Sequence, residues 1–384
     1  MKIGITTFQW ADNYGAVLQA YALQQFLTQR GHRVEIVNYW RGRSIRRWLR
    51  FAQYLPECFF RSGFQFLSLL RKLLPLSLKQ KVDAKYKNLV FANFRRDRLC
   101  LTEPFADKAD LVRFADEFDL LITGSDQVWN PRYLAQTEGM ADCYFLSFAR
   151  GETRKVSYAA SIGHADSSLM TKKWTSLLAD RLRTMDAISV REKSSVPLVE
   201  ELSGRTDAVA VADPTLLLRA QGYKAIMSGQ KIRKRYLFSY MLHGLEKDAA
   251  SQIKEISDGL GLKAVQCDAG RSKLFAGYML PAPTEWLSLI CHASFMVTNS
   301  FHGVMFCLIF NVPFVAILIN GKEGSMNARI LDVLSIAGLS HRVFALGEEI
   351  SEGLYRGQIE WDRVNALMEE FRGSSVRFLQ DQNI

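Results

Sequence analysis

The segment KIGITTFQWADNYGAVLQAYALQQFLTQRGHRVEIVNY, residues 2–39, decides the fold class. It begins with a short β-rich run, passes through a glycine-containing turn, and continues with a helical apolar pattern over residues 16–27. After Gly31 a second β-rich run covers residues 34–39. A strand, a helix and a strand joined by short turns predict a βαβ unit with two parallel strands.

Strand-like runs recur along the chain, and each leads into small or polar residues and then a helical pattern. Further strands of the first part are expected at 120–123, 155–159 and 187–190. This spacing predicts a parallel sheet covered by helices. After Asp213 the cycle restarts, so we predict an α/β chain with two Rossmann-like domains. In this second part we expect strands at 236–241, 263–266, 295–298 and 314–319, and helices at 247–260, 284–293 and 302–310.

The restart divides the chain into two domains and a C-terminal segment. We predict an N-terminal Rossmann-like domain over residues 1–213 and a C-terminal Rossmann-like domain over residues 214–345. Residues 346–384 contain an amphipathic pattern from about 361 to 379. An apolar stripe of this kind must pack against something, so we expect this helical segment to pack back onto a domain.

Positive charge is concentrated in residues 41–98, which we predict to be a basic, aromatic, helical insertion. The formal net charge of the chain is +10, yet this segment alone carries 15 Lys and Arg against 3 acidic residues. One interpretation is a solvated insertion. The other is an amphipathic surface that makes peripheral contact with an anionic membrane or holds a phosphate-bearing acceptor. Nucleic acid is not expected, because no recognised binding motif accompanies the charge.

Other patterns speak against several classes of protein. The longest apolar run, 304–319, is interrupted by Asn311 and Pro313 and is typical of a helix, a turn and a buried strand instead of a membrane span. The first residues lack the pattern of a signal peptide, so we expect a cytoplasmic protein. The six cysteines form no CxxC pair, and we find no P-loop, HExxH or Asp-x-Asp motif. Neither a metal nor a cofactor is therefore expected.

Polar residues directly after a predicted strand are the candidate site residues. Ligands of open α/β sheets bind at the carboxyl ends of strands, where helix N-termini favour anions. After the first strand, Gly15 would let the backbone approach a phosphate or carboxylate, and Asn13 can cap the helix. A capping turn without a ligand is an equally good interpretation.

A second candidate loop follows the strand at 120–123. Hydrogen-bonding side chains beside an indole suit a sugar-binding surface, because the apolar ring face stacks on Trp129 while polar groups meet hydroxyls. The alternative is an Asx turn with Trp129 buried. The candidate residues of this loop are Gly124, Ser125, Asp126, Gln127, Trp129 and Asn130.

A third candidate is Arg191, which closes the strand at 187–190. Its guanidinium can hold a carboxylate or phosphate through two parallel hydrogen bonds. The alternative is a surface ion pair with Glu192, which would contribute little.

The fourth place is Asn299-Ser300-Phe301-His302-Gly303, where a predicted strand meets a helix. At a helix N-terminus the dipole disfavours the charged form of His302 and keeps a proton available for transfer. A lone histidine is more often a packing or capping residue, but its small and polar neighbours favour catalysis. Among the other histidines only His164 is a rival. Asn299, Ser300 and Gly303 are candidate binding residues beside it.

Six segments of the chain, taken in order and spacing, resemble the polysaccharide pyruvyl transferase family. The resemblance implies two Rossmann-like domains facing a cleft, as in the GT-B glycosyltransferases. It also implies a transferase that moves a pyruvyl group from phosphoenolpyruvate to hydroxyls of a sugar or lipid-linked oligosaccharide during surface polysaccharide biosynthesis. The segments are NYGAVLQAYAL (13–23), GSDQVWNP (124–131), SYAASIG (157–163), SVREKSS (189–195), ADPTLLL (212–218) and VTNSFHG (297–303).

The implied chemistry needs a general acid/base and a cationic clamp for the carboxylate and phosphate of the donor. His302 is the candidate acid/base and Arg191 the candidate clamp. Asn327 and Arg329, in the polar stretch after the last strand, could complete the anion site.

One position departs from the family pattern. Some members carry an arginine where this chain has Ser300, so the missing cation must be replaced, by Arg329 or by Lys322. Two other hypotheses remain: a GT-B glycosyltransferase that uses a nucleotide sugar, and a non-catalytic protein that binds glycan or membrane.

Overall fold

The computed structural model describes most of the 384 residues. Part of the basic segment, His164 and Lys322 lie outside the described residues, and so does the stretch between the last predicted strand and Asn327. The described ranges are 1–39, 76–105, 108–134, 140–163, 171–229, 232, 234–242, 247–267, 278–319 and 327–384.

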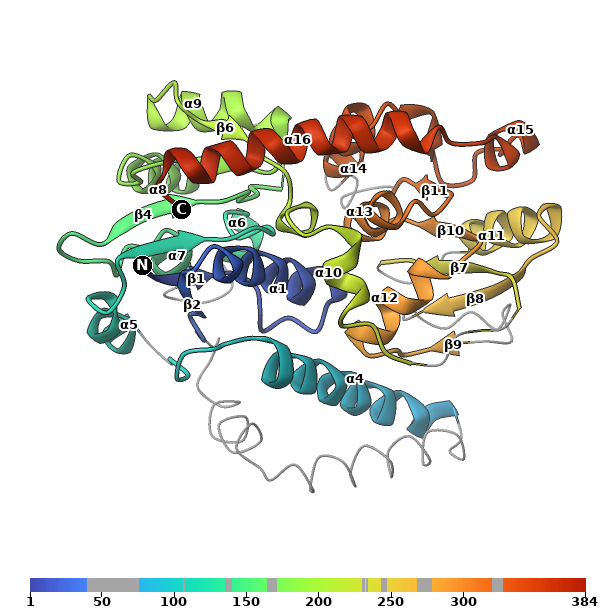
Figure 1. The fold of residues 1–384 in the computed structure, drawn as a ribbon, viewed down its shortest axis with the longest axis horizontal. Helices are drawn as coiled ribbons and strands as arrows, with labels where there is room; N and C mark the ends of the chain where they lie inside the picture. The colour runs from blue at the N-terminus through green and yellow to red at the C-terminus, as the bar shows by residue number, and fades with distance from the viewer. Residues whose placement is uncertain are drawn as a thin grey trace.

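The first part of the chain builds a four-stranded parallel sheet (Figure 1). In chain order its strands are β1 (Lys2–Thr6), β2 (Arg33–Ile36), β3 (Leu120–Thr123) and β4 (Arg154–Ser157). In space the order is β2-β1-β3-β4, with Ile3 of β1 beside both Val34 and Leu120. The buried, continuous apolar runs of β1 and β3 are typical of parallel strands covered on both faces.

Helix α1 (Tyr14–Gln29) joins β1 to β2 and confirms the predicted βαβ unit. Nearly all of its side chains are buried, which is the pattern of a helix enclosed on all sides. Asn13 caps it as predicted, because the Ala16 N–H donates to Asn13 Oδ1 at 3.2 Å. α1 therefore runs through the middle of the molecule, between the two sheets (Figure 1).

A short parallel pair extends the first half. It consists of β5 (Ser189–Val190) and β6 (Val209–Ala210), and single bridges link it to the end of β4. The helical elements of this half are α4 (Leu76–Arg98), α5 (Lys108–Ala115), α6 (Pro131–Leu134), α7 (Met140–Tyr144), α8 (Lys172–Leu182), η2 (Lys193–Ser195) and α9 (Val196–Ser203).

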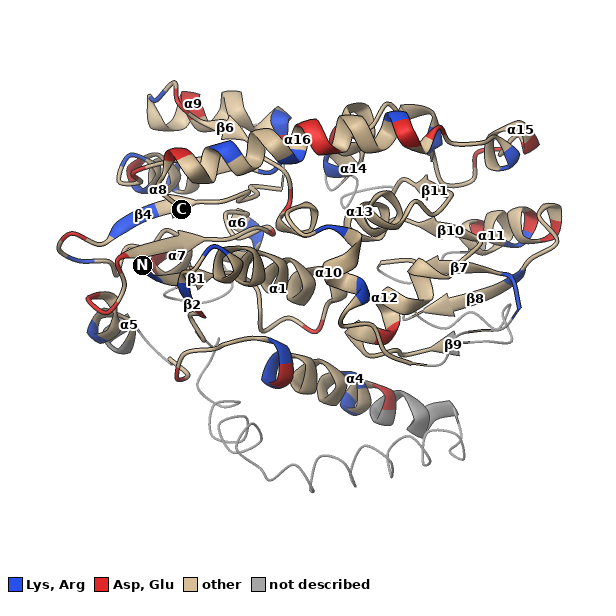
Figure 2. Ribbon diagram, viewed as in Figure 1, with Lys and Arg blue, Asp and Glu red and all other residues tan. Residues whose placement is uncertain are grey.

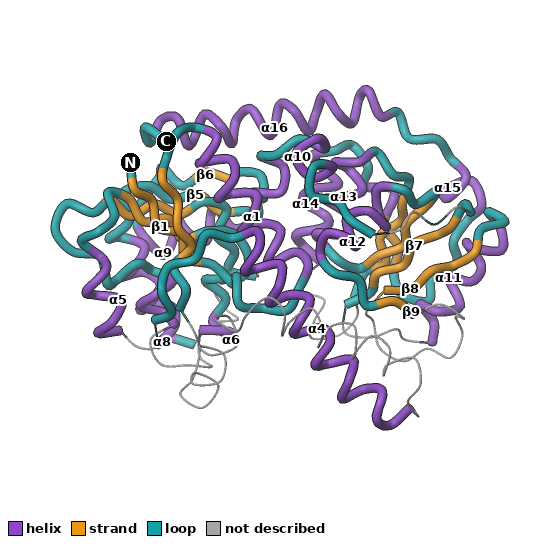
Figure 3. Tube along the Cα trace, turned by 60° about the horizontal axis from the view of Figure 1, so that its bottom comes forward, coloured by secondary structure: helices purple, strands orange, loops and turns teal. Residues whose placement is uncertain are grey.

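The second part of the chain forms a separate six-stranded parallel sheet (Figure 3). Its strands are β7 (Tyr236–Tyr240), β8 (Lys263–Cys267), β9 (Tyr278–Met279), β10 (Phe295–Thr298), β11 (Phe314–Ile317) and β12 (Val343–Phe344). Their spatial order is β12-β11-β10-β7-β8-β9. The helical elements are η3 (Pro214–Leu216), α10 (Ala220–Lys224), α11 (Lys247–Gly259), α12 (Pro283–Cys291), α13 (Phe301–Phe310), α14 (Ala328–Ile336), η5 (Ser340–Arg342) and α15 (Glu352–Arg356). The strands predicted in this half agree with these bounds to within two residues, whereas β9 and β12 were not predicted, and the strand expected at 34–39 in the first half already ends at Ile36. The division at residue 213, between β6 and η3, stays a prediction.

An aromatic stack joins the two halves. Tyr14, the first residue of α1, lies parallel to Trp286 of α12 with 4.9 Å between ring centroids. Its hydroxyl donates to the Pro281 carbonyl at 2.8 Å, and Phe91 of α4 packs against its ring at 5.0 Å. The four groups are buried or nearly so, and stacked rings in a dry contact bind two elements firmly.

The described part of the basic segment is α4, which packs against α1 and α12. Its aromatic side chains, Tyr86, Phe91 and Phe94, are buried in the core between the helices. Figure 2 shows its basic residues interspersed with acidic ones. Residues 41–75, which hold most of the predicted membrane-contact segment, lie outside the described residues. None of the helices that the structure describes has the length and apolar character needed to cross a membrane.

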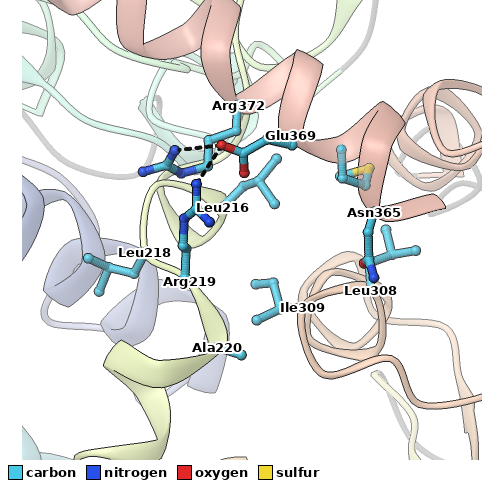
Figure 4. A pocket seen from close by; sticks show the side chains of 10 residues that line it. Leu216, Leu218, Arg219, Ala220, Leu308, Ile309, Asn365, Glu369 and Arg372 are labelled. Atoms are coloured by element: carbon cyan, nitrogen blue, oxygen red, sulfur yellow. Dashed lines mark hydrogen bonds and ion pairs between the residues drawn. The ribbon is translucent and has the colours of Figure 1, made fainter. Parts of the chain in front are cut away.

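The long helix α16 (Trp361–Asp381) crosses from the second half to the first along one face of the molecule (Figure 1). Near the crossing, Arg219 and Arg372 converge on Glu369, with N–O distances of 2.7 and 3.2 Å (Figure 4). At the far end, Arg154 Nη1 donates to the Gln382 carbonyl at 2.8 Å. α16 thus contacts the connecting segment and the first sheet.

Ser375 of α16 offers a test of this crossing. It is fully buried, its Oγ accepts from the Ala212 N–H at 2.8 Å, and it donates to the Phe371 carbonyl at 2.7 Å. We expect Ser375→Ala to lower the free energy of unfolding by about 1–3 kcal/mol, because the Ala212 N–H loses its acceptor. Ser374 bonds only to its own helix, so Ser374→Ala should cost less than about 0.5 kcal/mol. Urea unfolding measures both, and equal losses would contradict this role of Ser375.

Candidate active site

The carboxylate of Asp213 lies at the centre of a buried polar cluster. Its Oδ2 accepts hydrogen bonds from Ser125 Oγ at 2.8 Å and Arg191 Nη1 at 3.3 Å, and lies 3.5 Å from His302 Nε2. Its Oδ1 accepts from the Thr215 N–H at 3.0 Å and the Thr215 hydroxyl at 2.7 Å. All five residues are buried. Three residues predicted from three separate loops therefore meet at one carboxylate.

Asp213 was not predicted as a site residue, although it lies inside one of the family-like segments. The sequence analysis took Asp213-Pro214 as the restart of the strand–helix cycle. In the structure Asp213 caps η3, with Pro214 at the first helical position. The signal was present, because this acid comes shortly after β6, much as the polar residues of the four candidate loops come after strands.

The charge state of Asp213 is set by its neighbours. Burial alone would raise the pKa of this carboxyl, but His302, Arg191 and the Thr215 N–H together hold the pKa well below its usual range. Asp213 is therefore an anion at neutral pH. A buried anion with these partners can orient the His302 imidazole.

The lowered pKa of Asp213 predicts an acid-dependent loss of stability. Its contribution is fully present above the unfolded pKa of about 4 and is lost as the pH falls below that value. We expect Asp213→Asn to be less stable than the natural protein by about 3 kcal/mol at pH 7, and the gap to narrow by about 1 kcal/mol at pH 3. Urea unfolding at several pH values measures the gap.

The matched control for this experiment is Asp207→Asn. Asp207 pairs with Arg205 at the surface and is more than half exposed, so its removal should change stability little at either pH. A gap between Asp213→Asn and the natural protein that stays constant from pH 7 to pH 3 would contradict the low pKa.

His302 lies in the first turn of α13, where Ser300 is the N-cap and accepts from the Gly303 N–H at 3.3 Å. Its imidazole packs directly on Gly15 in the first turn of α1. A Cβ atom at Gly15 would lie 2.0 Å from His302 Nδ1. The predicted close backbone approach at Gly15 is thus an approach to the histidine, and two helix N-termini meet at this ring.

Gly15→Ala tests this contact. The added methyl group cannot fit against the imidazole, so we expect a loss of about 1–3 kcal/mol of stability and a displaced His302 ring. Thermal unfolding measures the first effect and the histidine C–H signals in NMR measure the second. Gly353→Ala, on α15 with nothing within 4 Å of its Cβ, should leave both unchanged. An unmoved His302 signal in Gly15→Ala would refute the contact.

Arg191 is buried, so the interpretation as a surface ion pair is wrong. Its Nε donates to Glu192 Oε1 at 3.0 Å, and both side chains are less than 5% exposed. The guanidinium carbon lies 4.7 Å from the centroid of the Phe301 ring. Among the described residues, Arg191 Nη2 and Glu192 Oε2 have no hydrogen-bond partner. Arg191 therefore keeps one unused hydrogen-bond donor inside the protein.

Arg329, in the first turn of α14, lies near Arg191. Burial lowers the pKa of the Arg329 guanidinium to about 10, and Arg191 acts in the same direction, while Glu192, Asp126 and Tyr133 oppose the shift. Arg329 therefore remains protonated at neutral pH. We call the small pocket between the halves the arginine pocket; its polar lining consists of Arg191, Glu192, Asp213, Arg329 and Asp332.

The prediction that Trp129 stacks on a sugar is wrong. Trp129 is fully buried, lies parallel to Phe145 at 5.3 Å, and donates its indole N–H to the Tyr144 carbonyl at 3.0 Å. The indole packs into the apolar core under the edge of the sheet, and so it supports the loop from the buried side. The alternative interpretation, an Asx turn over a buried tryptophan, describes this position.

The rest of this loop is polar and tightly packed. Asp126 has a left-handed backbone, with φ of 82°, and its Oδ1 accepts from the Gln127 N–H at 2.9 Å. Asn130 donates to Gln127 Oε1 at 2.6 Å, and both side chains lie against Gly163. Gly124 packs on the end of β1. Of these, Asn130 and Asp126 retain partial exposure at the edge of the sheet.

Asn299 and Asn327 hold strand ends in place. Asn299 exchanges two hydrogen bonds with the backbone of Leu242, at 2.5 and 3.2 Å. Asn327 does the same with Ile319, at 3.0 and 2.9 Å. Each amide uses its oxygen and its nitrogen in these bonds, so both side chains position strand ends, and direct ligand binding by them stays a prediction. In the part of the chain that the structure describes, no three His, Cys, Asp or Glu side chains are grouped to hold a metal.

A family model described as polysaccharide pyruvyl transferase matches residues 13–321. The chain belongs to this family. The matched range includes Asp213, Arg191 and His302. Membership of this family confirms the prediction that the protein is a transferase. No curated protein sequence matches the chain significantly.

The chain is also similar to several solved structures. A putative UDP-N-acetylglucosamine 2-epimerase from Listeria monocytogenes has a TM-score of 0.52 at 8% identity, over 97% of this chain and 91% of that one. The UDP-GlcNAc 2-epimerase of Methanocaldococcus jannaschii gives 0.48 at 10% identity (96% and 92% covered), and MurG of Acinetobacter baumannii gives 0.46 at 11% (97% and 94%). The first likeness shows the fold alone and confirms the predicted GT-B-like class.

Proposed function

We propose that this family member transfers a pyruvyl group from phosphoenolpyruvate to hydroxyls of a sugar. The observation that carries the proposal is the arginine pocket, which is lined by two buried guanidiniums and by the Asp213 carboxylate, whose Oδ2 also lies 3.5 Å from His302 Nε2. Phosphoenolpyruvate carries a carboxylate and a phosphate close together. Arg191 and Arg329 supply two cations, and Arg191 has an unused donor.

Some relatives carry an arginine where this chain has Ser300. The proposed donor site would bind phosphoenolpyruvate without that arginine. Ser300 Oγ is occupied as the N-cap of α13. Arg329 is buried within electrostatic range of Arg191, so it can supply the missing charge from a different element. Lys322, the other candidate, lies outside the described residues.

His302 would act as the general acid and base. The buried Asp213 carboxylate lies beside Nε2, and the imidazole would pass a proton to and from the ligand. Protonation of the donor methylene makes the adjacent carbon electrophilic, and a sugar hydroxyl oxygen bonds to it and gives up its proton. The carbon–oxygen bond to phosphate then breaks, and phosphate leaves. Loss of a methyl proton yields the enolpyruvyl ether, whereas attack by a second hydroxyl closes a ketal.

The proposal also covers the acceptor molecule and the place in the cell where the reaction occurs. We infer a sugar or lipid-linked oligosaccharide acceptor, used on the cytoplasmic side during surface polysaccharide synthesis. Residues 41–98 remain our candidate for peripheral contact with an anionic membrane. In the described part, α4, the aromatic side chains Tyr86, Phe91 and Phe94 pack in the core, and the exposed residues include the charged Lys85 and Arg98.

Binding and turnover test the proposal together. The protein is titrated with phosphoenolpyruvate by calorimetry, then incubated with donor and a glycan panel while phosphate and pyruvylated product are followed. We expect Arg191→Lys to weaken donor binding about 10- to 100-fold, because a point charge replaces a fork of donors. His302→Gln should bind the donor but lose about 100-fold or more in turnover.

Arg205→Lys is the control, since Arg205 pairs with Asp207 near the surface and should affect neither quantity. Thermal stabilisation by nucleotide sugars but not by phosphoenolpyruvate would favour the glycosyltransferase hypothesis. Normal turnover in His302→Gln would show that His302 is not the general acid or base. Binding of glycan without any phosphate release would favour the non-catalytic hypothesis.

A further inference from the structure

A cavity of about 210 Å³ lies where helix α16 crosses the second half of the chain (Figure 4). Its wall comes from η3 and the start of α10, from the C-terminal part of α13, and from the middle of α16. It shares no lining residue with the arginine pocket, so it is a second and separate cavity. We call it the crossing cavity, and its lining includes Leu216, Arg219, Leu308, Met368, Glu369 and Arg372.

One side of the crossing cavity is apolar. Leu216, Leu308 and Met368 are buried core residues, while Ile309 and Ala220 are half-buried. In Figure 4, Ile309 of α13 and Ala220 of α10 lie away from the ionic contacts of the other side. Small-molecule sites are typically lined in this way, because an apolar ligand body and an apolar wall leave water together. This side of the cavity therefore suits the apolar body of a ligand.

The other side carries an excess of positive charge. The charged residues of the cavity wall are Arg219, Arg372 and Glu369, and both guanidiniums donate to the same Glu369 carboxylate, at 2.7 and 3.2 Å. Arg30, at the C-cap of α1, adds a further cation nearby: burial lowers the pKa of its guanidinium, and repulsion from Arg372 lowers it further. One carboxylate thus serves three cations, and an anionic group is the complementary partner.

Arg219 has hydrogen-bonding capacity left for such a group. Its side chain is 69% exposed, and among the described residues it donates through Nη2 alone, to Glu369. A guanidinium can bind a carboxylate or a phosphate through two parallel hydrogen bonds. The existing ion pairs are also easily rearranged, because exposed pairs of this kind contribute little to stability. An anion that enters the cavity can therefore bind Arg219 at a small cost to the fold.

We propose that the crossing cavity binds a small amphipathic anion, whose carboxylate or phosphate head contacts Arg219 and Arg372 and whose apolar body lies against the buried leucine and methionine side chains. This inference goes beyond the proposed pyruvyl transfer and does not rest on it. The two cavities have no residue in common, so binding at one can be measured independently of binding at the other.

A ligand in the crossing cavity would contact three elements that also hold the polar cluster. Thr215 of η3 donates to Asp213, His302 lies at the start of α13, and Ser375 of α16 accepts from the Ala212 N–H. A ligand that binds only the folded chain stabilises it by mass action. We therefore expect occupancy of the crossing cavity to raise the melting temperature of the protein.

Calorimetric titration with octanoate and with octyl phosphate tests the cavity, and octan-1-ol and octylamine are the neutral and cationic counterparts. We expect saturable binding of at least one anion with a Kd of about 0.1–1 mM, a higher melting temperature in its presence, and at least about tenfold weaker binding of the alcohol and the amine. The tighter of the two anions identifies the preferred head group.

Variants of the cavity wall separate its charge from its shape. Arg219→Gln should weaken anion binding about tenfold, whereas Glu369→Gln should strengthen it about threefold or more, because the competing carboxylate is gone. Ala220→Phe fills the apolar side and should weaken binding about tenfold or more while it keeps every charge. Arg363→Gln is the control, since Arg363 is exposed on α16 and does not line the cavity.

Circular dichroism checks the folding of each variant, and phosphoenolpyruvate binding is measured on the same samples. Absence of saturable binding by both anions would overturn the proposal, and so would undiminished binding in folded Ala220→Phe or weaker binding in Glu369→Gln. A phosphoenolpyruvate affinity that falls together with the anion affinity in Arg219→Gln would contradict the separation of the two sites. Anion binding that follows the expected pattern, in a protein that fails to bind phosphoenolpyruvate, would support the crossing cavity and exclude the proposed donor.

Discussion

The Asp213 carboxylate is the group on which the polar centre of the molecule depends. It holds Ser125 and Arg191 from the first half and lies against His302 from the second. Without a buried anion, the guanidinium and the imidazole would be two positive or potentially positive groups with no charge between them. Because the Asp213 pKa is held low by these same neighbours, the cluster supports itself electrostatically.

The cluster can exist only because the two halves are docked firmly against each other. Tyr14 stacks on Trp286 across the interface, and Gly15, the next residue, leaves room for the His302 ring. Helix α16 then joins the residue before Asp213 to the first sheet, because Ser375 accepts from the Ala212 N–H and the Gln382 carbonyl accepts from Arg154. Residues that shape the candidate site and residues that join the halves are therefore neighbours in sequence, which links the docking of the halves to the geometry of that site.

Aromatic and amide side chains in similar loops have different roles, and the burial of each side chain distinguishes these roles. Trp129 and Trp10 both follow strands of the first sheet, yet the first is wholly enclosed and the second lies at the edge of the core. Asn299 and Asn327 both follow strands of the second sheet, and the amides of both form hydrogen bonds with backbone groups. The type of residue and its position after a strand do not distinguish a ligand contact from a structural bond.

The sequence by itself determined the α/β class, the parallel strands and the family, and it placed Gly15, Arg191 and His302 after the carboxyl ends of strands. The strands follow from local periodicity and the site positions from the rule that ligands of α/β sheets bind after strand ends, and both depend on chain order alone. Only the tertiary structure decided that Asp213 joins Arg191 to His302, that Trp129 is core, and that Trp10 lies at the edge of the core. Burial and ion pairing depend on neighbours distant in the chain, and no local pattern encodes those distances.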